Sequence, residues 1–389
     1  MFQQSHSKHK AGFGETTVRK IGAAERIKSI QHQRSVSRSN YRRSIAKGSR
    51  TRHSPREPAP QGYSRGIAAI PRNSKRVVIW LPQTLSLRDN FAGTVNIITQ
   101  IRDAVLKRNT PVMLRFDDVV SIEPAATLML AAEIDRCRRL RTIAGGLVVN
   151  GNYPQDTDLF LQLREMGFYR IIGVPDREEI PDERETANRP RFLRFFSFND
   201  VQSEVAASVT DLVSVGAFSM SDQLKRRMTG AVKEAMGNAV EHAYSQPGQL
   251  PALLGRWWCA VYVHPVDSEM MIILFDQGVG VPGTLDANLF DLIRSIVARN
   301  WGVSDGYMIA AATDLYRTST GQAGRGRGFR DMKRFIDSCD DGELRIVSNG
   351  GSYRYMKGFE AIDDEPISIG GTLVEWRVKH SKTADFEDA

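Results

Sequence analysis

Three short segments most constrain what this chain of 389 residues can fold into. They are Glu234–Ala243 (EAMGNAVEHA), Asp276–Pro282 (DQGVGVP) and Gly324–Phe329 (GRGRGF). A turn rich in Asp and Gly is common, and a glycine-rich loop by itself is a weak signal. The three segments together, in this order along the second half of the chain, are stronger evidence than any one of them alone. In chain order, they predict a helix, the end of a strand and a second glycine-rich loop.

Residues 221–244 have the spacing of a helix with one buried face. Its apolar positions are Leu224, Met228, Val232, Ala235, Met236, Ala239, Val240 and Ala243. At about 100° per residue, Glu234, Asn238 and Glu241 fall together on a neighbouring face. The carboxamide of Asn238 suits Mg²⁺, an ion that also binds substrate phosphates. The carboxylate of Glu234 can orient or deprotonate an attacking water or hydroxyl.

The second segment follows an apolar run of strand length, residues 270–275. Asp276, at the strand end, can accept a hydrogen bond from an exocyclic amine such as that of adenine. Gly278 and Gly280 would let the backbone approach a flat ligand closely.

The third segment places Gly324, Gly326 and Gly328 before a predicted helix over 328–338. Free N–H groups at the start of a helix can hold phosphate oxygens. No strand directly precedes these glycines and no Gly-Lys-Ser/Thr follows them, so the segment is neither a Rossmann fingerprint nor a P-loop.

Together the segments resemble the nucleotide site of the GHKL ATPases, the superfamily of gyrase, histidine kinases and MutL-type proteins, over about residues 200–380. The resemblance implies a Bergerat α/β sandwich with a mixed, largely antiparallel sheet, and ATP and Mg²⁺ as cofactors. It makes Glu234 the catalytic base, Asn238 the Mg²⁺ ligand and Asp276 the residue that reads adenine. The other cofactor-binding positions that it implies are Gly278, Gly280, Gly324, Gly326, Gly328 and Thr372.

The same resemblance makes residues 284–323 a lid over the nucleotide. Within the superfamily, the helix around Glu234 is most similar to that of the anti-sigma-factor serine kinases, whereas histidine kinases usually carry Asn at that position. His242 is expected to pack or hydrogen-bond near the site as a structural residue. Arg325 and Arg327 either contact phosphate or are solvated, and residues 349–370 form an unassigned insertion.

Residues 77–175 alternate apolar runs of strand length with helical patterns, which predicts an α/β domain with a partly parallel sheet. Strands are expected at 77–81, 111–116 and 146–150, and helices at 87–107, 125–138 and 157–166. The order resembles the STAS fold of anti-sigma-factor antagonists. That family carries a phosphoacceptor hydroxyl at a strand-to-helix turn, where this chain has Glu123, Pro124 and Ala125. The resemblance therefore implies a docking or sensing module.

Charge separates the N-terminal segment from the rest of the chain. Residues 1–76 contain 18 Lys and Arg against 3 Asp and Glu, while the remainder contains 35 against 42. Few apolar residues occur in 1–76, which predicts a disordered basic tail. We expect a charged linker at 176–199 and a C-terminal tail at 381–389. The composition of residues 1–76 also fits a transit peptide, but the resemblance of the domains implies a bacterial cytoplasmic protein.

The sequence leaves three functions open. The first is an ATP–Mg²⁺-dependent regulator that transfers the γ-phosphate to a protein Ser/Thr or to water, in a signalling pathway of the partner-switching type. The second is a non-kinase switch driven by ATP binding. The third is an ATPase that associates with nucleic acid through residues 1–76. A protein partner or substrate is expected, a homodimer is left open, and no apolar run is long enough for a transmembrane segment.

Overall fold

The structure is a computed structural model that describes residues 68–71, 73–143, 146–175, 190–206, 208–209, 220–244, 255–285, 304–315 and 328–379. All of them belong to one compact unit, residues 60–389. Most of the predicted basic tail and all of the predicted C-terminal tail lie outside the described residues. No helix within the described ranges combines the length and the apolar composition needed to cross a membrane.

The N-terminal region, residues 68–175, alternates strands and helices as predicted. Its strands are β1 (Ala68–Ile70), β2 (Val77–Trp80), β3 (Thr84–Leu85), β4 (Val112–Arg115), β5 (Ser121–Ile122), β6 (Arg141–Ile143) and β7 (Val149–Gly151). Its helices are α2 (Phe91–Arg102), α3 (Pro124–Leu140), α4 (Thr157–Glu165) and α5 (Phe168–Ile172), and a π-helical turn over Asp103–Lys107 continues α2.

The named strands of the N-terminal region pair in parallel, in the order β2-β4-β7, with separate pairs β3-β5 and β1-β6. Parallel strands are usually covered on both faces, but β2 exposes Val78 (49 %) and Trp80 (58 %) on one of its faces. The pairing of β1 with β6 also corrects the predicted tail boundary, because residues 68–70 already form a strand within the predicted tail 1–76.

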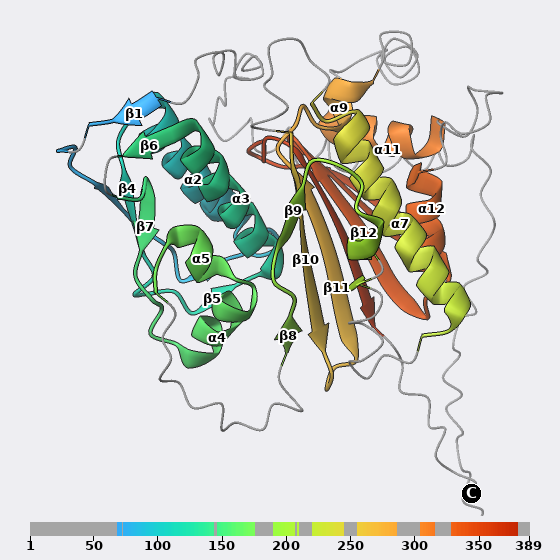
Figure 1. Cartoon of the computed structure of the whole chain (residues 1–389). Helices are drawn as coiled ribbons and strands as arrows, with labels where there is room; N and C mark the ends of the chain where they lie inside the picture. Colours follow the sequence, from blue (N-terminus) through green and yellow to red (C-terminus); the bar gives the residue numbers. More distant parts are fainter. Residues whose placement is uncertain are drawn as a thin grey trace, which may run out of the picture. The chain divides into compact units, whose positions relative to one another are not determined.

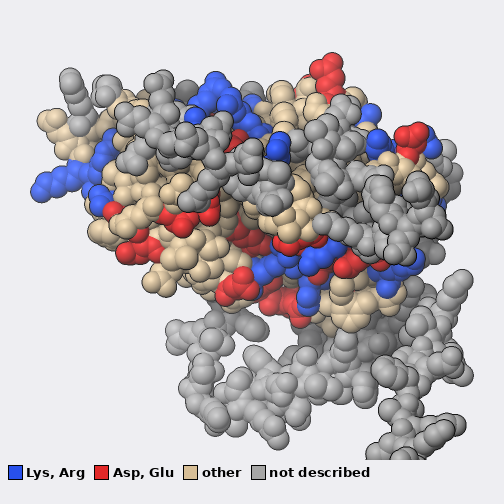
Figure 2. Space-filling model, turned by 90° about the horizontal axis from the view of Figure 1, so that it is seen from below, with Lys and Arg blue, Asp and Glu red and all other residues tan. Residues whose placement is uncertain are grey.

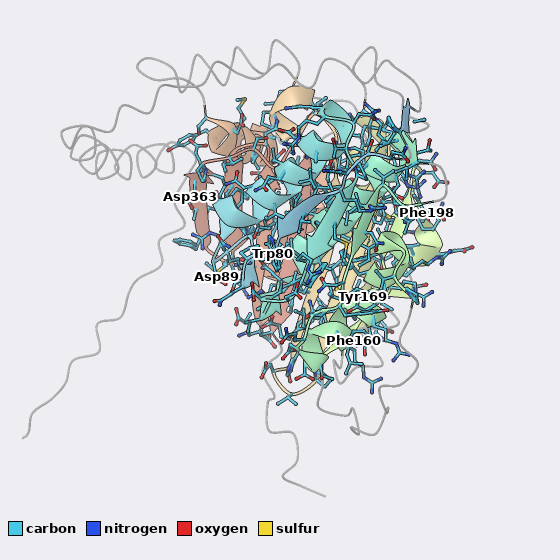
Figure 3. The ribbon with its side chains drawn as sticks, turned by 90° about the vertical axis from the view of Figure 1, so that its left-hand side faces the viewer. Trp80, Asp89, Phe160, Tyr169, Phe198 and Asp363 are labelled. Atoms are coloured by element: carbon cyan, nitrogen blue, oxygen red, sulfur yellow. The ribbon has the colours of Figure 1, made fainter. Side chains whose placement is uncertain are left out.

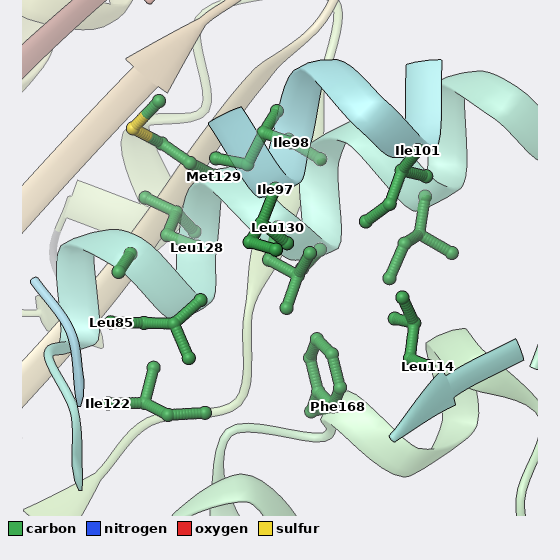
Figure 4. Close-up of a cluster of buried hydrophobic side chains, with 14 of the residues drawn as sticks. Leu85, Ile97, Ile98, Ile101, Leu114, Ile122, Leu128, Met129, Leu130 and Phe168 are labelled. Atoms are coloured by element: carbon green, nitrogen blue, oxygen red, sulfur yellow. The ribbon is translucent and has the colours of Figure 1, made fainter. Parts of the chain in front are cut away.

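The core of the N-terminal region is made of aliphatic side chains from α2, α3 and the strands (Figure 4). Ile101, Leu114 and Phe168 are fully buried there. At the other end of the region, the rings of Phe160 and Tyr169 stack with their centroids 5.0 Å apart (Figure 3). Most residues of α3 are buried in this core.

The second region, residues 190–379, is built on an antiparallel sheet. Its strands are β8 (Arg191–Phe192), β9 (Phe196–Phe198), β10 (Trp257–His264), β11 (Glu269–Asp276), β12 (Asp341–Ser348), β13 (Gly351–Met356), β14 (Phe359–Asp364) and β15 (Thr372–Lys379). The helices are α7 (Asp222–Glu241), α9 (Val281–Thr284), α11 (Asp305–Leu315) and α12 (Gly328–Asp337). The described part of the sheet runs β14-β13-β12-β15-β11-β10-β8, with β9 also on β10. Every pairing in it is antiparallel, so the expected mixed character is absent from these strands.

Two expectations about this region need correction. The predicted linker over 176–199 includes strands β8 and β9, because the backbone there pairs with β10. The unassigned stretch 349–370 forms the hairpin of β13 and β14, whose turn contains Gly358 at φ +81°, a conformation that favours glycine.

Strand β11 is apolar from Met270 to Phe275, between the acidic residues at its two ends, because both faces of the sheet are covered (Figure 1). On one face, Ile272 and Leu274 pack with α7, α11 and α12. On the other, Ile273 and Phe275 belong to the same core as α2 and α3 of the N-terminal region. An antiparallel strand with one wet face would alternate polar and apolar residues, and this one does not.

Lys and Arg side chains are interspersed with Asp and Glu on the face of the described part that Figure 2 shows. This mixture agrees with the charge count, which assigns the basic excess of the chain to residues 1–76.

Candidate functional site

Helix α7 begins at a capped turn, where the Ser221 hydroxyl accepts the Leu224 N–H at 3.2 Å. Its buried arc consists of Met228, Ala231, Val232, Ala235, Met236 and Ala239. Glu234 and Asn238 are half-buried on one flank of that arc, about 40° apart around the axis. Val240 lies at the opposite edge of the arc and is 38 % exposed, so its assignment to the buried stripe was wrong.

The start of α12 lies against this flank of α7. A β-carbon at Gly328 would be 2.9 Å from Glu234 Oε2 and 3.6 Å from Asn238 Nδ2. Helix α12 is held in place by Met332, Phe335 and Ile336, which are buried in the core shared with α7. The structure therefore brings together Glu234, Asn238 and the last glycine of the third segment, as predicted.

The pKa of Glu234 is raised above its ordinary value. Partial burial is the main cause, and the negative charges of Asp331 and Glu241 add to it. A carboxylate with a raised pKa is a better proton acceptor when it is ionised, which suits a general base.

Asp276 ends β11 and is only 7 % exposed. Its Oδ1 accepts the Gly278 N–H at 2.9 Å. Burial raises its pKa to about 7, although hydrogen bonds from the N–H groups of Gly278 and Thr372 act in the opposite direction. Carboxyl groups whose pKa is raised toward neutrality occur often at functional sites.

The glycines of the second segment are required by close packing against protein atoms. A β-carbon at Gly278 would be 2.3 Å from the Ala243 carbonyl oxygen, and the Val279 N–H donates to the same oxygen at 2.9 Å. Gly280 has φ +77°, and a β-carbon there would be 2.6 Å from Asn349 Nδ2. The loop after Asp276 is thus fixed to the end of α7, one turn beyond Asn238.

Thr372 lies beside Asp276 on the neighbouring strand β15. A β-carbon at Gly371 would be 1.9 Å from the Asp276 carbonyl oxygen, so only glycine fits there. The Thr372 hydroxyl is 3.0 Å from Ser348 Oγ, and the Ser348 hydroxyl also accepts the Val281 N–H at 2.8 Å. Ser348 therefore connects the loop after Asp276 with the start of β15.

Sequence reasoning missed Ser348 and Asn349. Asn349 Nδ2 donates to the Val279 carbonyl at 3.0 Å, and its backbone has φ +49°. The only local signal is the run Ser-Asn-Gly-Gly at 348–351, which is typical of a turn. Nothing in that run indicates a contact with a loop about seventy positions earlier.

Other predicted features are only partly described. Gly324, Gly326, Arg325 and Arg327 lie outside the described residues. Of the predicted lid 284–323, residues 305–315 form α11, whose Ile309 and Ala312 are fully buried in the core. The lid prediction is therefore wrong for α11, which is part of the packed fold.

His242 caps the C-terminal end of α7 and its side chain is 55 % exposed. Its Nε2 lies 3.8 Å from a carboxylate oxygen of Glu241, which is itself 72 % exposed. The side chain is therefore too exposed for close packing near the site. The alternative expectation, that His242 forms a hydrogen bond near the site, stays a prediction.

The turn before α3 connects the N-terminal region with the antiparallel sheet of the second region. Glu123 Oε2 accepts the Leu87 N–H at 2.7 Å, and its other oxygen lies 3.5 Å from Arg88 Nε. Arg88 also donates to Glu343 at 2.6 Å and to Glu375, which is fully buried. The carboxylate of Glu123 thus belongs to a charged cluster that joins the two regions.

A cavity of about 240 Å³ lies elsewhere, between β5, α4 and β8. Its polar lining includes Ser121, Asp156, Asp158 and Gln162. None of its lining residues belongs to the predicted site, and Asp156 already caps α4 through the Leu159 N–H.

Within the described residues, no group of three or more His, Cys, Asp or Glu side chains could hold a metal ion. Asn238 and Glu234 alone would leave most positions around a cation to water or to substrate oxygens. That donor set fits Mg²⁺ bound together with a phosphate chain, and not a metal held by protein ligands only.

Comparison of the chain with protein-family models gives no match, and comparison with curated proteins gives none either. The functional conclusion therefore depends on the geometry and chemistry of the residues described above.

Proposed function

We propose that residues 190–379 form an ATP-binding domain of the GHKL type and that the N-terminal region is a STAS-like docking or sensing module. The observation that carries the proposal is the convergence of the predicted segments. Gly328 lies against Glu234, Gly278 lies against Ala243 at the end of the same helix, and Thr372 donates to Asp276. Four segments far apart in sequence thereby border one area beside α7.

In this proposal Asp276 accepts a hydrogen bond from the adenine amine. Asn238 would hold Mg²⁺, which when bound would neutralise charge on the phosphates. The start of α12 lies beside the side of α7 that carries Asn238, and a helix start favours anions. The proposal thus gives each part of ATP a separate group of residues.

Glu234 is then the group that acts on the nucleophile. It accepts the proton of a serine or threonine hydroxyl, or of water, as that oxygen attacks the γ-phosphorus and ADP leaves. Its half-buried position next to Asn238 and its raised pKa support this role. The substrate would be a protein partner in a cytoplasmic signalling pathway of the partner-switching type.

A second function, an ATP-driven switch without protein phosphorylation, has one observation in its favour. Gln277, next to Asp276, donates a hydrogen bond to Glu133 of the N-terminal region at 2.9 Å. Nucleotide binding could in that way alter the N-terminal region directly. Association with nucleic acid through residues 1–76 stays a prediction, since that segment lies almost wholly outside the described residues.

Two experiments test the proposal. Thermal shift with ATP or ADP, with and without Mg²⁺, should show stabilisation of the wild type and a weaker effect for Asp276→Asn. Incubation with γ-labelled ATP and candidate partners then separates the two functions, because only a kinase yields phosphoserine or phosphothreonine. Absence of any nucleotide-dependent shift in the wild type would refute ATP binding.

A further inference from the structure

A fully buried carboxylate of the N-terminal region lies at the edge of the proposed nucleotide site. Glu133, on α3, is 0 % exposed and is held by two arginines. Arg102 Nη2 and Arg136 Nη2 lie 3.0 Å and 2.7 Å from Glu133 Oε2. The same oxygen accepts the side-chain N–H of Gln277 at 2.9 Å. A carboxylate that is paired twice and buried has a fixed position.

Gln277 is the residue directly after Asp276, and its backbone is fixed as well as its side chain. The Gln277 N–H donates to Tyr244 Oη at 2.9 Å, and that hydroxyl donates to the Arg256 carbonyl at 2.7 Å. The next residue, Gly278, gives its N–H to Asp276 Oδ1. The position of the Gln277 peptide therefore sets the direction of the Asp276 carboxylate.

The same charged group reaches the loop on the other side of Asp276. A β-carbon at Gly370 would lie 3.5 Å from Arg102 Nη1, which places the guanidinium directly against the loop before Thr372. The two loops that flank Asp276 thus both contact the cluster of Arg102, Glu133 and Arg136. A shift of α2 or α3 would move both.

We propose that Glu133 and Gln277 are positioning residues for the adenine-binding carboxylate, and that through them the N-terminal region controls nucleotide affinity. This proposal rests on the proposed function of Asp276. Coupling of this kind is reciprocal, so nucleotide binding must also stabilise α3. A ligand or protein bound to the N-terminal region would change ATP affinity by displacing α3.

The test uses the full chain, the Asp276→Asn variant and four further variants. Gln277→Leu removes the hydrogen bond with little change in volume, and Gln277→Glu places two carboxylates side by side. The double variant Gln277→Glu/Glu133→Gln exchanges the two groups and keeps the total charge. Gln162→Leu is the matched control, because it removes a glutamine hydrogen bond to the Ile122 carbonyl elsewhere in the N-terminal region.

Two quantities are measured for each variant: the Kd of a fluorescent ATP analogue, and amide hydrogen exchange over residues 124–140 with and without saturating ATP. In the wild type and in Gln162→Leu, ATP should slow exchange in α3. Gln277→Leu and Gln277→Glu should raise the Kd about tenfold and lose the response of α3 even when saturated. The exchanged double variant should return to within about threefold of the wild-type Kd.

The outcomes separate this inference from the proposed function. If the wild type binds no ATP, both are refuted. If the wild type binds, and Asp276→Asn weakens binding while Gln277→Leu changes neither the Kd nor the exchange of α3, only the coupling is refuted. A loss of affinity in Gln277→Glu that the double variant fails to restore, although it folds, also contradicts the role of Glu133.

Discussion

Glu234 Oε2 lies 2.9 Å from the place that a β-carbon would occupy at Gly328, so the start of α12 meets the carboxylate flank of α7 without a side chain between them. Any larger residue at 328 would displace Glu234. This relationship joins the predicted general base to the predicted phosphate-binding loop.

Glu234→Ala should spare nucleotide binding and reduce phosphoryl transfer at least a hundredfold, because general-base catalysis typically contributes that much. The measurement is turnover of γ-labelled ATP beside the Kd of the same variant. Glu241→Ala is the control, since Glu241 lies on the same helix and is largely exposed. Full turnover in Glu234→Ala would remove Glu234 from the mechanism and make Glu241 the next candidate.

The pH dependence of adenine binding should follow Asp276. The carboxylate form accepts the adenine N–H, and the pKa of Asp276 is about 7, so affinity should rise as pH increases from 6 to 8. Asp276→Asn should bind more weakly and lose most of that dependence. Titration with the ATP analogue at several pH values checks this, and a wild-type profile that is flat between 6 and 8 would contradict it.

Stability should respond to the same group in the opposite sense. The folded-state pKa of Asp276 lies above the ordinary value, so its contribution is fully present below about pH 4 and is lost as pH rises to about 7. The slope is at most about 1.4 kcal/mol per pH unit. In thermal unfolding, the stability of Asp276→Asn relative to the wild type should therefore increase from pH 5 to about pH 7 and level off above it. A constant difference in Tm would refute the shifted pKa.

Gly278→Ala should destabilise the protein by about 1–3 kcal/mol, because its β-carbon would overlap the Ala243 carbonyl. Gly230→Ala is a matched control in α7, where nothing lies within 4 Å of the added carbon. The control should stabilise the protein by up to about 1 kcal/mol through helix propensity. Urea unfolding of both variants measures the difference, and equal effects would contradict the close approach of the loop to α7.

Ile272→Ala and Ile273→Ala should each cost about 2–5 kcal/mol, as expected for fully buried isoleucines. The two side chains point to opposite faces of β11, and only Ile273 packs in the core that includes the N-terminal region. Equilibrium unfolding of the two variants tests whether the N-terminal region buries this face of β11. A cost below about 1 kcal/mol for Ile273→Ala alone would mean that this face of the sheet is not buried.

Sequence periodicity was enough for the long elements. Residues 221–244 and 270–275 have strong patterns, and α7 and β11 lie where they were expected because burial of one arc, or of a whole strand, dictates the residue types. Helix α12 and strand β15, which begins at Thr372, also lie where they were expected, for the same reason.

The elements that were missed depend on distant partners. Strands β8 and β9 are two and three residues long and exist only through pairing with β10, so no local pattern could reveal them. The glycine at 278 was predictable as a loop residue, but its contact with Ala243 is a property of the packed fold. The same holds for Ser348 and for the bond between Gln277 and Glu133, which join segments far apart in the chain.

The double burial of β11 has a consequence for any attempt to isolate the second region. A shortened chain that began near residue 190 would expose an apolar surface that includes Trp258, Met271, Ile273, Phe275 and Leu373. Such a fragment would self-associate or precipitate, and assays on it would report on aggregates and not on the folded second region.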